Sequence, residues 1–315
     1  MNKTQTTQLV RDLAAAQGFD RVGIAPAVRT ERASYLQQWL ADGQAGEMEY
    51  LKRYLDKRVD PAQLLPGARS VIVTALNYHQ PTPPIGDNQP RGKVARYAWG
   101  DDYHEVIKKK LWSIVDSLRQ AISEPFEAKP CVDSTPILER EFAARAGIGW
   151  IGKNTMVLHQ ELGSYFFLGE IVTTLDLQPD SPATDHCGSC TRCLDACPTD
   201  AFPAPYQMDA RRCISYHTIE LRGDIPTEFQ EAIGDWVFGC DICQEVCPFN
   251  QSAPYTSEKA FNIRPPSPHP PLNELLDWQT ADYRSILKGS AMKRAKLDML
   301  KRNAGIALRN HERKT

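Results

Sequence analysis

Two cysteine runs dominate the sequence. The first is Cys187-Gly-Ser-Cys190-Thr-Arg-Cys193-Leu-Asp-Ala-Cys197-Pro198, and the second is Cys240-Asp-Ile-Cys243-Gln-Glu-Val-Cys247-Pro248. In the bacterial ferredoxin pattern, three closely spaced thiolates bind one [4Fe-4S] cluster, while the cysteine before proline binds the other cluster. The first stretch matches this spacing at every position. The sequence therefore predicts two iron–sulfur clusters.

Eight of the nine cysteines lie between residues 187 and 247, and the ferredoxin rule divides them into two sets of four. The first set is Cys187, Cys190, Cys193 and Cys247, and the second set is Cys197, Cys213, Cys240 and Cys243. An insertion separates Cys213 from the rest of its run, and this insertion carries Tyr216, His217, Trp236 and Phe238. Its presence indicates a use besides cluster binding.

Two alternatives to iron–sulfur clusters are a pair of four-cysteine zinc sites and a disulfide framework, since thiolates at x2 spacing also suit tetrahedral zinc. Zinc motifs seldom keep three cysteines at successive x2 gaps followed by Cys-Pro. Disulfides need an oxidising compartment, and nothing in the chain indicates one. We therefore favour clusters over both alternatives.

The composition is that of an ordinary soluble protein, with 315 residues, 42% hydrophobic residues and a net charge of −2. The length corresponds to about two domains. Residues 1–27 show an amphipathic helix pattern and a Gly/Pro turn, without a signal peptide or twin arginine. No stretch approaches the roughly 18 apolar residues that a membrane-spanning helix needs. We expect a cytoplasmic protein, where reduced thiols persist.

Helices and strands alternate through the first 180 residues. Residues 70–78 are rich in β-branched side chains and predict a buried strand, and 165–177 predict another. Apolar residues at helical spacing predict a helix over 103–122, with Asp101 or Asp102 as N-cap, and a second helix covers about 136–146. This order predicts an α/β or layered α+β fold.

Three segments are expected along the chain. Residues 1–180 form the α/β domain, 181–255 form the ferredoxin-like cluster module, and 256–315 form a Pro-rich linker and a helical, basic tail. The sequence Gly147-Ile-Gly149-Trp-Ile-Gly152 matches a dinucleotide-binding fingerprint, but these glycines follow a helix instead of a strand. They predict a helix stop and a turn.

The segment Pro130-Cys131-Val132-Asp133-Ser134-Thr135-Pro136 precedes the second helix. Thr135 is suited to cap this helix and Pro136 to occupy its first position. Asp133 then lies outside the helix, either as an exposed loop acid or as a catalytic one, and spacing alone favours the loop acid. Cys131 is expected to be a small buried hydrophobe.

Four segments in this order closely resemble the epoxyqueuosine reductase family over nearly the whole chain. They are Arg96-Tyr-Ala-Trp-Gly-Asp-Asp-Tyr-His104, Val132-Asp-Ser-Thr-Pro-Ile-Leu-Glu-Arg140, Gly147-Ile-Gly-Trp-Ile-Gly-Lys-Asn-Thr155 and the cluster module. The resemblance implies a cobalamin in the N-terminal domain, whose fold is similar to that of nitroreductases and reductive dehalogenases. It also implies electron delivery by two [4Fe-4S] clusters and reductive opening of an epoxide on the wobble base of tRNA, with loss of water.

The resemblance also implies roles for individual residues. Asp133 matches the proton donor of the family, and burial is expected to raise its pKa toward neutrality. Residues matching the corrin surroundings are Arg58, Tyr97, Asp133, Lys153, Asn154, Thr155 and Ser215. Cobalamin rests on the resemblance alone, because Asp102-Tyr-His104-Glu-Val-Ile107 lacks the glycine of the Asp-x-His-x-x-Gly signature.

The C-terminal tail is strongly basic. Its cationic residues are Arg284, Lys288, Lys293, Arg294, Lys296, Lys301, Arg302, Arg309, Arg313 and Lys314, against Asp298 and Glu312. Such a surface suits the phosphates of a tRNA anticodon stem-loop, although a solvated helix face is the commoner explanation. Many family members continue beyond Arg302-Asn303-Ala304 as a helical extension. We further expect an external low-potential electron donor, no membrane association and a monomer.

Two other functions use similar parts. A reductive dehalogenase would apply cobalamin and clusters to a small organohalide, but such enzymes usually carry a twin-arginine signal, which is missing here. A non-catalytic electron carrier would need only a small docking domain, whereas about 180 residues precede the clusters. The interpretation implied by the resemblance, a reductase of a modified tRNA base, therefore remains the favoured one.

Overall fold

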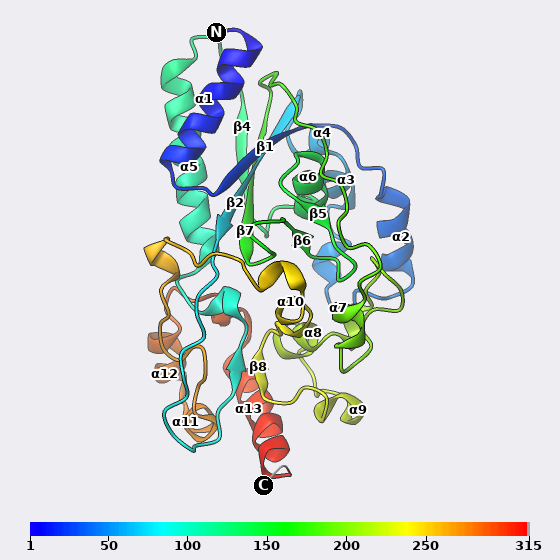
Figure 1. The fold of residues 1–315 in the computed structure, drawn as a ribbon, viewed down its shortest axis with the longest axis vertical. Helices are drawn as coiled ribbons and strands as arrows, with labels where there is room; N and C mark the ends of the chain where they lie inside the picture. The colour runs from blue at the N-terminus through cyan, green and yellow to red at the C-terminus, as the bar shows by residue number, and fades with distance from the viewer. Residues whose placement is uncertain (314–315) are drawn as a thin grey trace.

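The centre of the computed structural model, which describes residues 1–313, is a four-stranded antiparallel sheet in the order β1-β2-β7-β4 (Figure 1). Its strands are β1 (Arg21–Pro26), β2 (Ser70–Asn77), β4 (Ala128–Cys131) and β7 (Phe166–Thr173). β2 pairs with β7 along its full length, from Ser70 opposite Thr173 to Asn77 opposite Phe166. Both strands predicted from the sequence are therefore confirmed.

Helices cover both faces of this sheet. Side chains alternate between faces along a strand, so Ile72 and Leu76 of β2 pack with α1 (Lys3–Ala16) and α5 (Tyr103–Ala121). Val71, Val73 and Ala75 of β2 pack on the opposite face with α6 (Glu139–Arg145). Figure 1 shows α1 and α5 on one side of the sheet and α6 on the other. The layered α/β prediction is confirmed.

Helix α6 begins later than predicted. The structure starts it at Glu139, and the residue in the N-cap position, Leu138, makes no side-chain cap. The predicted cap at Thr135 and first position at Pro136 are wrong because the chain bends at Asp133, whose φ of 46° is left-handed. Gly147 ends α6 with a φ of 71°, as the glycine pattern predicted.

After Gly147 the chain enters a hairpin of β5 (Trp150–Ile151) and β6 (Val157–Leu158). The glycines therefore open a strand and no nucleotide-binding helix. Short helices and turns form the rest of the N-terminal half: α2 (Ala33–Ala41), α3 (Leu55–Val59), α4 (Pro61–Leu64) and the turns η1 (Glu49–Leu51) and η2 (Arg96–Ala98). The cluster region contains α7 (Arg192–Asp195), η3 (Ala210–Arg212), α8 (Ile214–Ile219), α9 (Thr227–Gln230), β8 (Trp236–Phe238), α10 (Ile242–Glu245) and η4 (Pro248–Asn250).

The tail packs onto the cluster region instead of standing apart. It consists of η5 (Lys259–Phe261), α11 (Leu272–Asp277), α12 (Thr280–Ile286), η6 (Ala291–Arg294) and α13 (Leu297–Glu312). A shared core joins Leu300 of α13 to Phe238 of β8 and Trp99 beside η2. β8 also pairs in parallel with β3 (Lys93–Val94). Packing thus crosses residues 180 and 255, and the three-part division stays a prediction.

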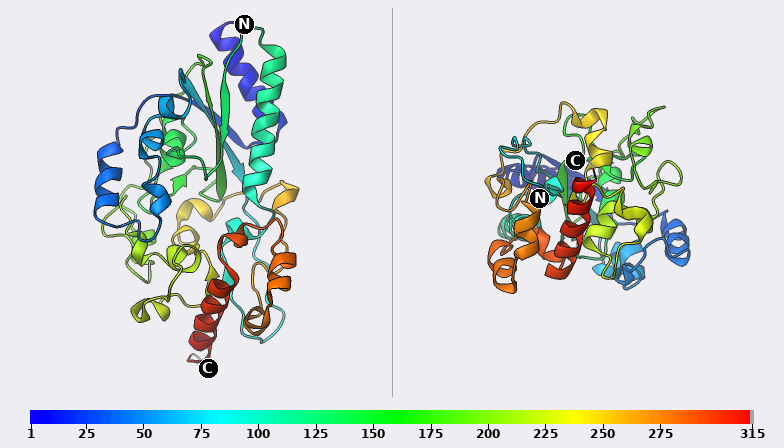
Figure 2. Two further views of the ribbon diagram at one scale, coloured as in Figure 1. Left: turned by 180° about the vertical axis from the view of Figure 1, so that it is seen from behind. Right: turned by 90° about the horizontal axis from the view of Figure 1, so that it is seen from below.

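Figure 2 shows the same arrangement from behind, with the N-terminus at one end of the long axis and α13 at the other. Among the described residues, no helix combines the length and the apolar composition needed to cross a bilayer. Lys314, predicted as part of the basic tail, lies outside the described residues.

Candidate active site

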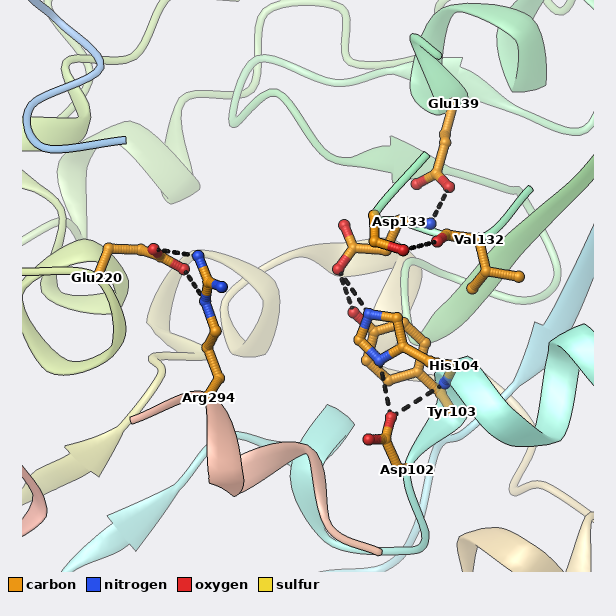
Figure 3. Close-up of polar contacts among 9 residues, drawn as sticks. Asp102, Tyr103, His104, Val132, Asp133, Glu139, Glu220 and Arg294 are labelled. Atoms are coloured by element: carbon orange, nitrogen blue, oxygen red, sulfur yellow. Dashed lines mark hydrogen bonds and ion pairs between the residues drawn. The ribbon is translucent and has the colours of Figure 1, made fainter. Parts of the chain in front are cut away.

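Asp133 lies at the centre of a hydrogen-bonded group at the edge of the sheet (Figure 3). Its carboxylate Oδ2 accepts hydrogen bonds from the Tyr103 hydroxyl at 2.7 Å and from His104 Nε2 at 3.0 Å. Asp102, the N-cap of α5, accepts the backbone N–H of His104 at 3.1 Å and contacts its Nδ1 at 2.7 Å. The N-cap of one helix therefore aligns an Asp102–His104–Asp133 chain.

Of these three hydrogen-bonded residues, His104 holds the proton and the positive charge. Burial alone would lower the pKa of His104, but its hydrogen bonds to Asp102 and Asp133 outweigh burial and raise the pKa to about 9. Burial alone would raise the pKa of Asp133, but hydrogen bonds from His104 and Tyr103 outweigh burial and lower the pKa. The Asp133 side chain is 57% exposed. The raised pKa expected for a buried Asp133 is therefore not observed, and near neutral pH the proton of the pair sits on His104.

A second polar group faces Asp133 from the cluster insertion and the tail. Arg294 of η6 donates to both carboxylate oxygens of Glu220, at 2.9 and 2.7 Å, and its guanidinium lies 5.2 Å from the Tyr50 ring centre. Burial chiefly raises the pKa of Tyr50 and the hydrogen bond to Glu220 chiefly raises that of Arg294, and the charge of Asp133 adds to both shifts. Figure 3 shows the Glu220–Arg294 pair to one side of the Asp133 carboxylate.

Sequence reasoning missed Tyr50, Glu220 and Arg294 as site residues. The signals for two of them were present, since Glu220 belongs to the insertion after Cys213 and Arg294 to the basic tail. Neither signal pointed to Asp133, which lies far away along the chain. The insertion thus places Glu220 near Asp133, and a use besides cluster binding stays a prediction.

Two of the predicted corrin residues lie near Asp133. Arg58, in α3, has a buried Nε without a hydrogen-bond partner among residues 1–313, and burial lowers its pKa. The ring of Tyr97 lies 6.2 Å from that of Tyr103 in an edge-on arrangement, and burial followed by the charge of Asp133 raises the pKa of Tyr97 well above its usual value. Ser215 lies in α8, two residues after Cys213, and is half-buried.

Lys153, Asn154 and Thr155 form a turn that is held by its neighbours. Lys153 Nζ donates to the carbonyls of Gly188 and Cys190 at 2.7 and 3.0 Å, and Asn154 Nδ2 donates to the Cys243 carbonyl at 3.3 Å. Arg140 donates to the carbonyl of Thr155 at 2.7 Å. The first two side chains thus join the turn to both cysteine runs, and their role toward a corrin stays a prediction.

The cysteines of the two runs lie close to one another. Burial and the thiols of Cys247, Cys187 and Cys190 raise the pKa of Cys193 to about 11. Burial and the neighbouring thiols Cys213 and Cys197 likewise raise the pKa of Cys243. None of the nine cysteines forms a disulfide. Trp150 Nε1 donates a hydrogen bond to Cys187 Sγ at 3.4 Å, and the Ala201 N–H donates one to Cys197 Sγ at 3.3 Å. The division of the thiols between two clusters stays a prediction.

Comparison with known proteins agrees with this geometry. Residues 186–250 match the family model "4Fe-4S double cluster binding domain". Residues 58–134 match the model "Epoxyqueuosine reductase QueG, DUF1730". The epoxyqueuosine reductase of Cellulophaga algicola is 43% identical over 309 residues, which cover 96% of this chain and 97% of that protein. The chain belongs to the epoxyqueuosine reductase family. It is an oxidoreductase with a double [4Fe-4S] domain.

Solved structures give the same result. An epoxyqueuosine reductase bound to an epoxyqueuosine-modified tRNA-Tyr stem loop superimposes with a TM-score of 0.89 at 34% identity, over 98% of this chain and 82% of that chain. The enzyme of Bacillus subtilis, in a form whose catalytic aspartate loop is swung out of the active site, also gives 0.89 with the same identity and coverage. A reductive dehalogenase, NpRdhA, shares only the fold, with a TM-score of 0.50 at 14% identity over 99% of this chain and 36% of that chain. The comparisons support epoxyqueuosine reduction over dehalogenation or simple electron carriage.

Proposed function

We propose that this chain reduces epoxyqueuosine at the tRNA wobble position to queuosine, in the cytoplasm, with cobalamin and two [4Fe-4S] clusters as cofactors. The observation that carries the proposal is the hydrogen-bonded group of Asp133, His104 and Tyr103, which has the Glu220–Arg294 pair to one side. A half-exposed carboxylate that contacts an imidazolium is suited to pass a proton to a ligand oxygen.

The reaction consumes two electrons and two protons, and the epoxide oxygen leaves as water. Asp133 presents the first proton, which it draws from His104 Nε2 at 3.0 Å. Asp102 holds the opposite ring nitrogen and so fixes the orientation of the imidazole. The His104 side chain is 33% exposed, so it can regain a proton from solvent for the second transfer. General acid catalysis of this kind contributes roughly 10² to 10⁴ in rate.

The residues around Asp133 suit a corrin. The buried Nε–H of Arg58 has no protein acceptor among the described residues, so an amide carbonyl of the cofactor can accept it. Tyr97 and Ser215 supply hydroxyl groups, while Lys153, Asn154 and Thr155 offer mainly backbone contacts because the first two side chains are engaged elsewhere. Bound cobalamin would supply a strong reduced nucleophile.

Each cluster takes the four cysteines assigned from the spacing. Cys187, Cys190, Cys193 and Cys247 hold the first cluster, and Cys197, Cys213, Cys240 and Cys243 hold the second. The contributions of Cys193 and Cys197 to the raised pKa of Cys243 support close placement of the two sets. The loop around the first set is largely exposed, which suits entry of electrons from an external low-potential donor. We propose that the protein acts as a monomer.

The tRNA phosphates would meet the basic side chains of the tail. A hollow of about 530 Å³ lies between α9 and α13, and Lys301, Arg302 and Arg309 contribute to its lining. Arg302 is largely engaged with the carbonyls of His217 and Leu221, so Lys301 and Arg309 are the freer cations. A related reductase binds a modified stem loop, which supports this partner.

The decisive experiment is anaerobic turnover of an epoxyqueuosine-containing stem-loop by reconstituted protein and a low-potential reductant, with cobalamin added or omitted. Queuosine should form only with cobalamin present. If intact clusters and bound corrin gave no queuosine, the proposed substrate would be wrong, and organohalide reduction would be the next activity to assay.

A further inference from the structure

Glu170 is a fully buried acid in the middle of the central sheet. It lies on β7 opposite Val73 of β2 and Cys131 of β4, and none of its surface is exposed. Neither carboxyl oxygen has a hydrogen-bond partner within residues 1–313. Burying a carboxyl group costs free energy unless it stays neutral or finds a partner. This side chain therefore needs an explanation beyond packing.

The carboxyl of Glu139 is the partner at hand. Glu170 lies opposite Val73, whose face of the sheet packs against α6, and the charges of Glu139 and Glu170 act on each other. Burial, followed by the charge of Asp133, raises the pKa of Glu139 to about 7, and burial followed by Glu139 raises that of Glu170 much further. Two interacting buried carboxyl groups disfavour a second negative charge, so Glu170, whose pKa is raised further, is the member that keeps a proton to donate.

Glu139 in turn holds the backbone of the catalytic loop. Its Oε1 accepts a short hydrogen bond from the backbone N–H of Asp133. Asp133 has a φ of 46°, a left-handed conformation that is unfavourable for residues other than glycine and persists only when its surroundings enforce it. Figure 3 shows Glu139 on the opposite side of Asp133 from Tyr103 and His104. Glu139 thus holds the backbone amide of Asp133, while Tyr103 and His104 hold its carboxylate.

We propose that Glu170 and Glu139 form a positioning pair, in which the Glu170 hydroxyl donates to the Glu139 carboxylate and Glu139 holds the Asp133 amide. This pair keeps the strained turn in place and so keeps the Asp133 carboxylate at the reacting oxygen. The inference rests on the proposed function, since it assigns Asp133 the proton transfer. It adds two acids that touch neither substrate nor cofactor.

Charged and titratable groups from several elements surround the pair. They are Arg58 of α3, Tyr103 of α5, Cys131 of β4, Asp133 of the loop and Arg140 of α6. Both arginines favour one negative charge on the pair, while Asp133 disfavours a second. A single shared proton satisfies all of these neighbours.

The test compares Glu170→Gln with Glu170→Leu in the full chain with both clusters and cobalamin. The glutamine variant keeps a neutral donor toward Glu139, whereas the leucine variant fills the space without one. We expect Glu170→Leu to lower kcat for the epoxyqueuosine stem-loop about 10- to 100-fold, because a small displacement of a catalytic group costs about this much. KM should change less than about twofold, and Glu170→Gln should stay within about threefold of the parent kcat.

A second readout needs no substrate. Amide hydrogen exchange over residues 131–138 should increase in Glu170→Leu and stay at the parent level in Glu170→Gln. Equal kcat and equal loop protection in Glu170→Leu and the parent would overturn the inference, as would equal losses in both variants. If Glu170→Leu does not fold, Glu139→Ala and Glu139→Gln give the same comparison at a half-buried position. Failure of the parent protein to form queuosine would sink the proposed function, while the exchange data would still test the pair.

Discussion

The cluster module and the acid site around Asp133 are built on opposite principles. The cysteines of the module lie between residues 187 and 247, and their predicted ligand sets follow mainly from gaps of two and three residues. The acid site joins residues that lie 29 and 30 positions apart in sequence, and it faces a Glu220–Arg294 pair whose members are 74 positions apart. Local spacing therefore reveals most of the cluster ligands in the sequence, whereas no local pattern reveals the partners of the proton site.

This difference also determines what stabilises each region. The cluster module contains short helices and loops, so binding of the proposed clusters would add to the stability that its apolar core with the tail provides. The acid site uses a helix cap, a strained turn and buried carboxyl groups, all supplied by the chain itself. Substitutions in the cluster module should therefore lower iron content and stability, whereas those in the acid site should lower the reaction rate.

The largest expected effect is the loss of a cluster ligand. Cys243→Ser removes a thiolate from the second set, so we expect loss of about one cluster's iron, less stable protein and no turnover. Cys131→Ser is the matched control, because Cys131 is buried but lies outside both sets. It should keep all iron and lose about 1 kcal/mol of stability. Iron analysis and thermal melts separate the two, and a full iron content in Cys243→Ser would break the assignment.

Sequence spacing predicted the cluster module more fully than the acid site. The double-cluster domain, the strands at 70–78 and 165–177 and the Asp102 cap followed from local patterns. The start of α6 did not follow from such a pattern. Thr135 does not cap the helix, which begins at Glu139, and Glu139 instead accepts the backbone N–H of Asp133. The pKa direction at Asp133 was also out of reach, since His104 reverses the effect of burial. These failures share one cause, which is contact between distant segments.

The next largest effect is expected at Asp133. Asp133→Asn keeps the shape of the side chain but cannot pass a proton, so we expect single-turnover reduction to slow by about 10² to 10⁴. Cluster and corrin spectra should match those of the parent. Asp116→Asn, on the exposed surface of α5, is the control and should leave the rate unchanged. If Asp133→Asn kept the normal rate, the proton donor would be another residue, with Tyr97 and His104 as the next candidates.

A smaller effect, visible in the pH profile, is expected at His104. Its raised pKa of about 9 means that the proton is held below pH 9 and lost as the pH rises through that value. The single-turnover rate of the parent should therefore be level near neutrality and fall about tenfold per pH unit well above pH 9. His104→Gln should be about 10- to 100-fold slower at pH 7 and should lack this alkaline limb. His311→Gln is the control and should keep the alkaline fall in rate. If His104→Gln also kept it, the fall would belong to another group.

The smallest effects are expected at the outer surface of the tail. Lys301 and Arg309 border the hollow beside α9, and each contacts phosphate in our proposal. Replacing both with Gln should weaken stem-loop binding about 10-fold near physiological salt and reduce the slope of log affinity against log salt by about one per lost contact. Lys108→Gln, on the exposed side of α5, should change neither value. Because saturating stem-loop restores occupancy, the rate of bound substrate should equal that of the parent. A lower rate at saturation would mean that the tail also shapes the acid site, as the position of Arg294 across from Asp133 already suggests.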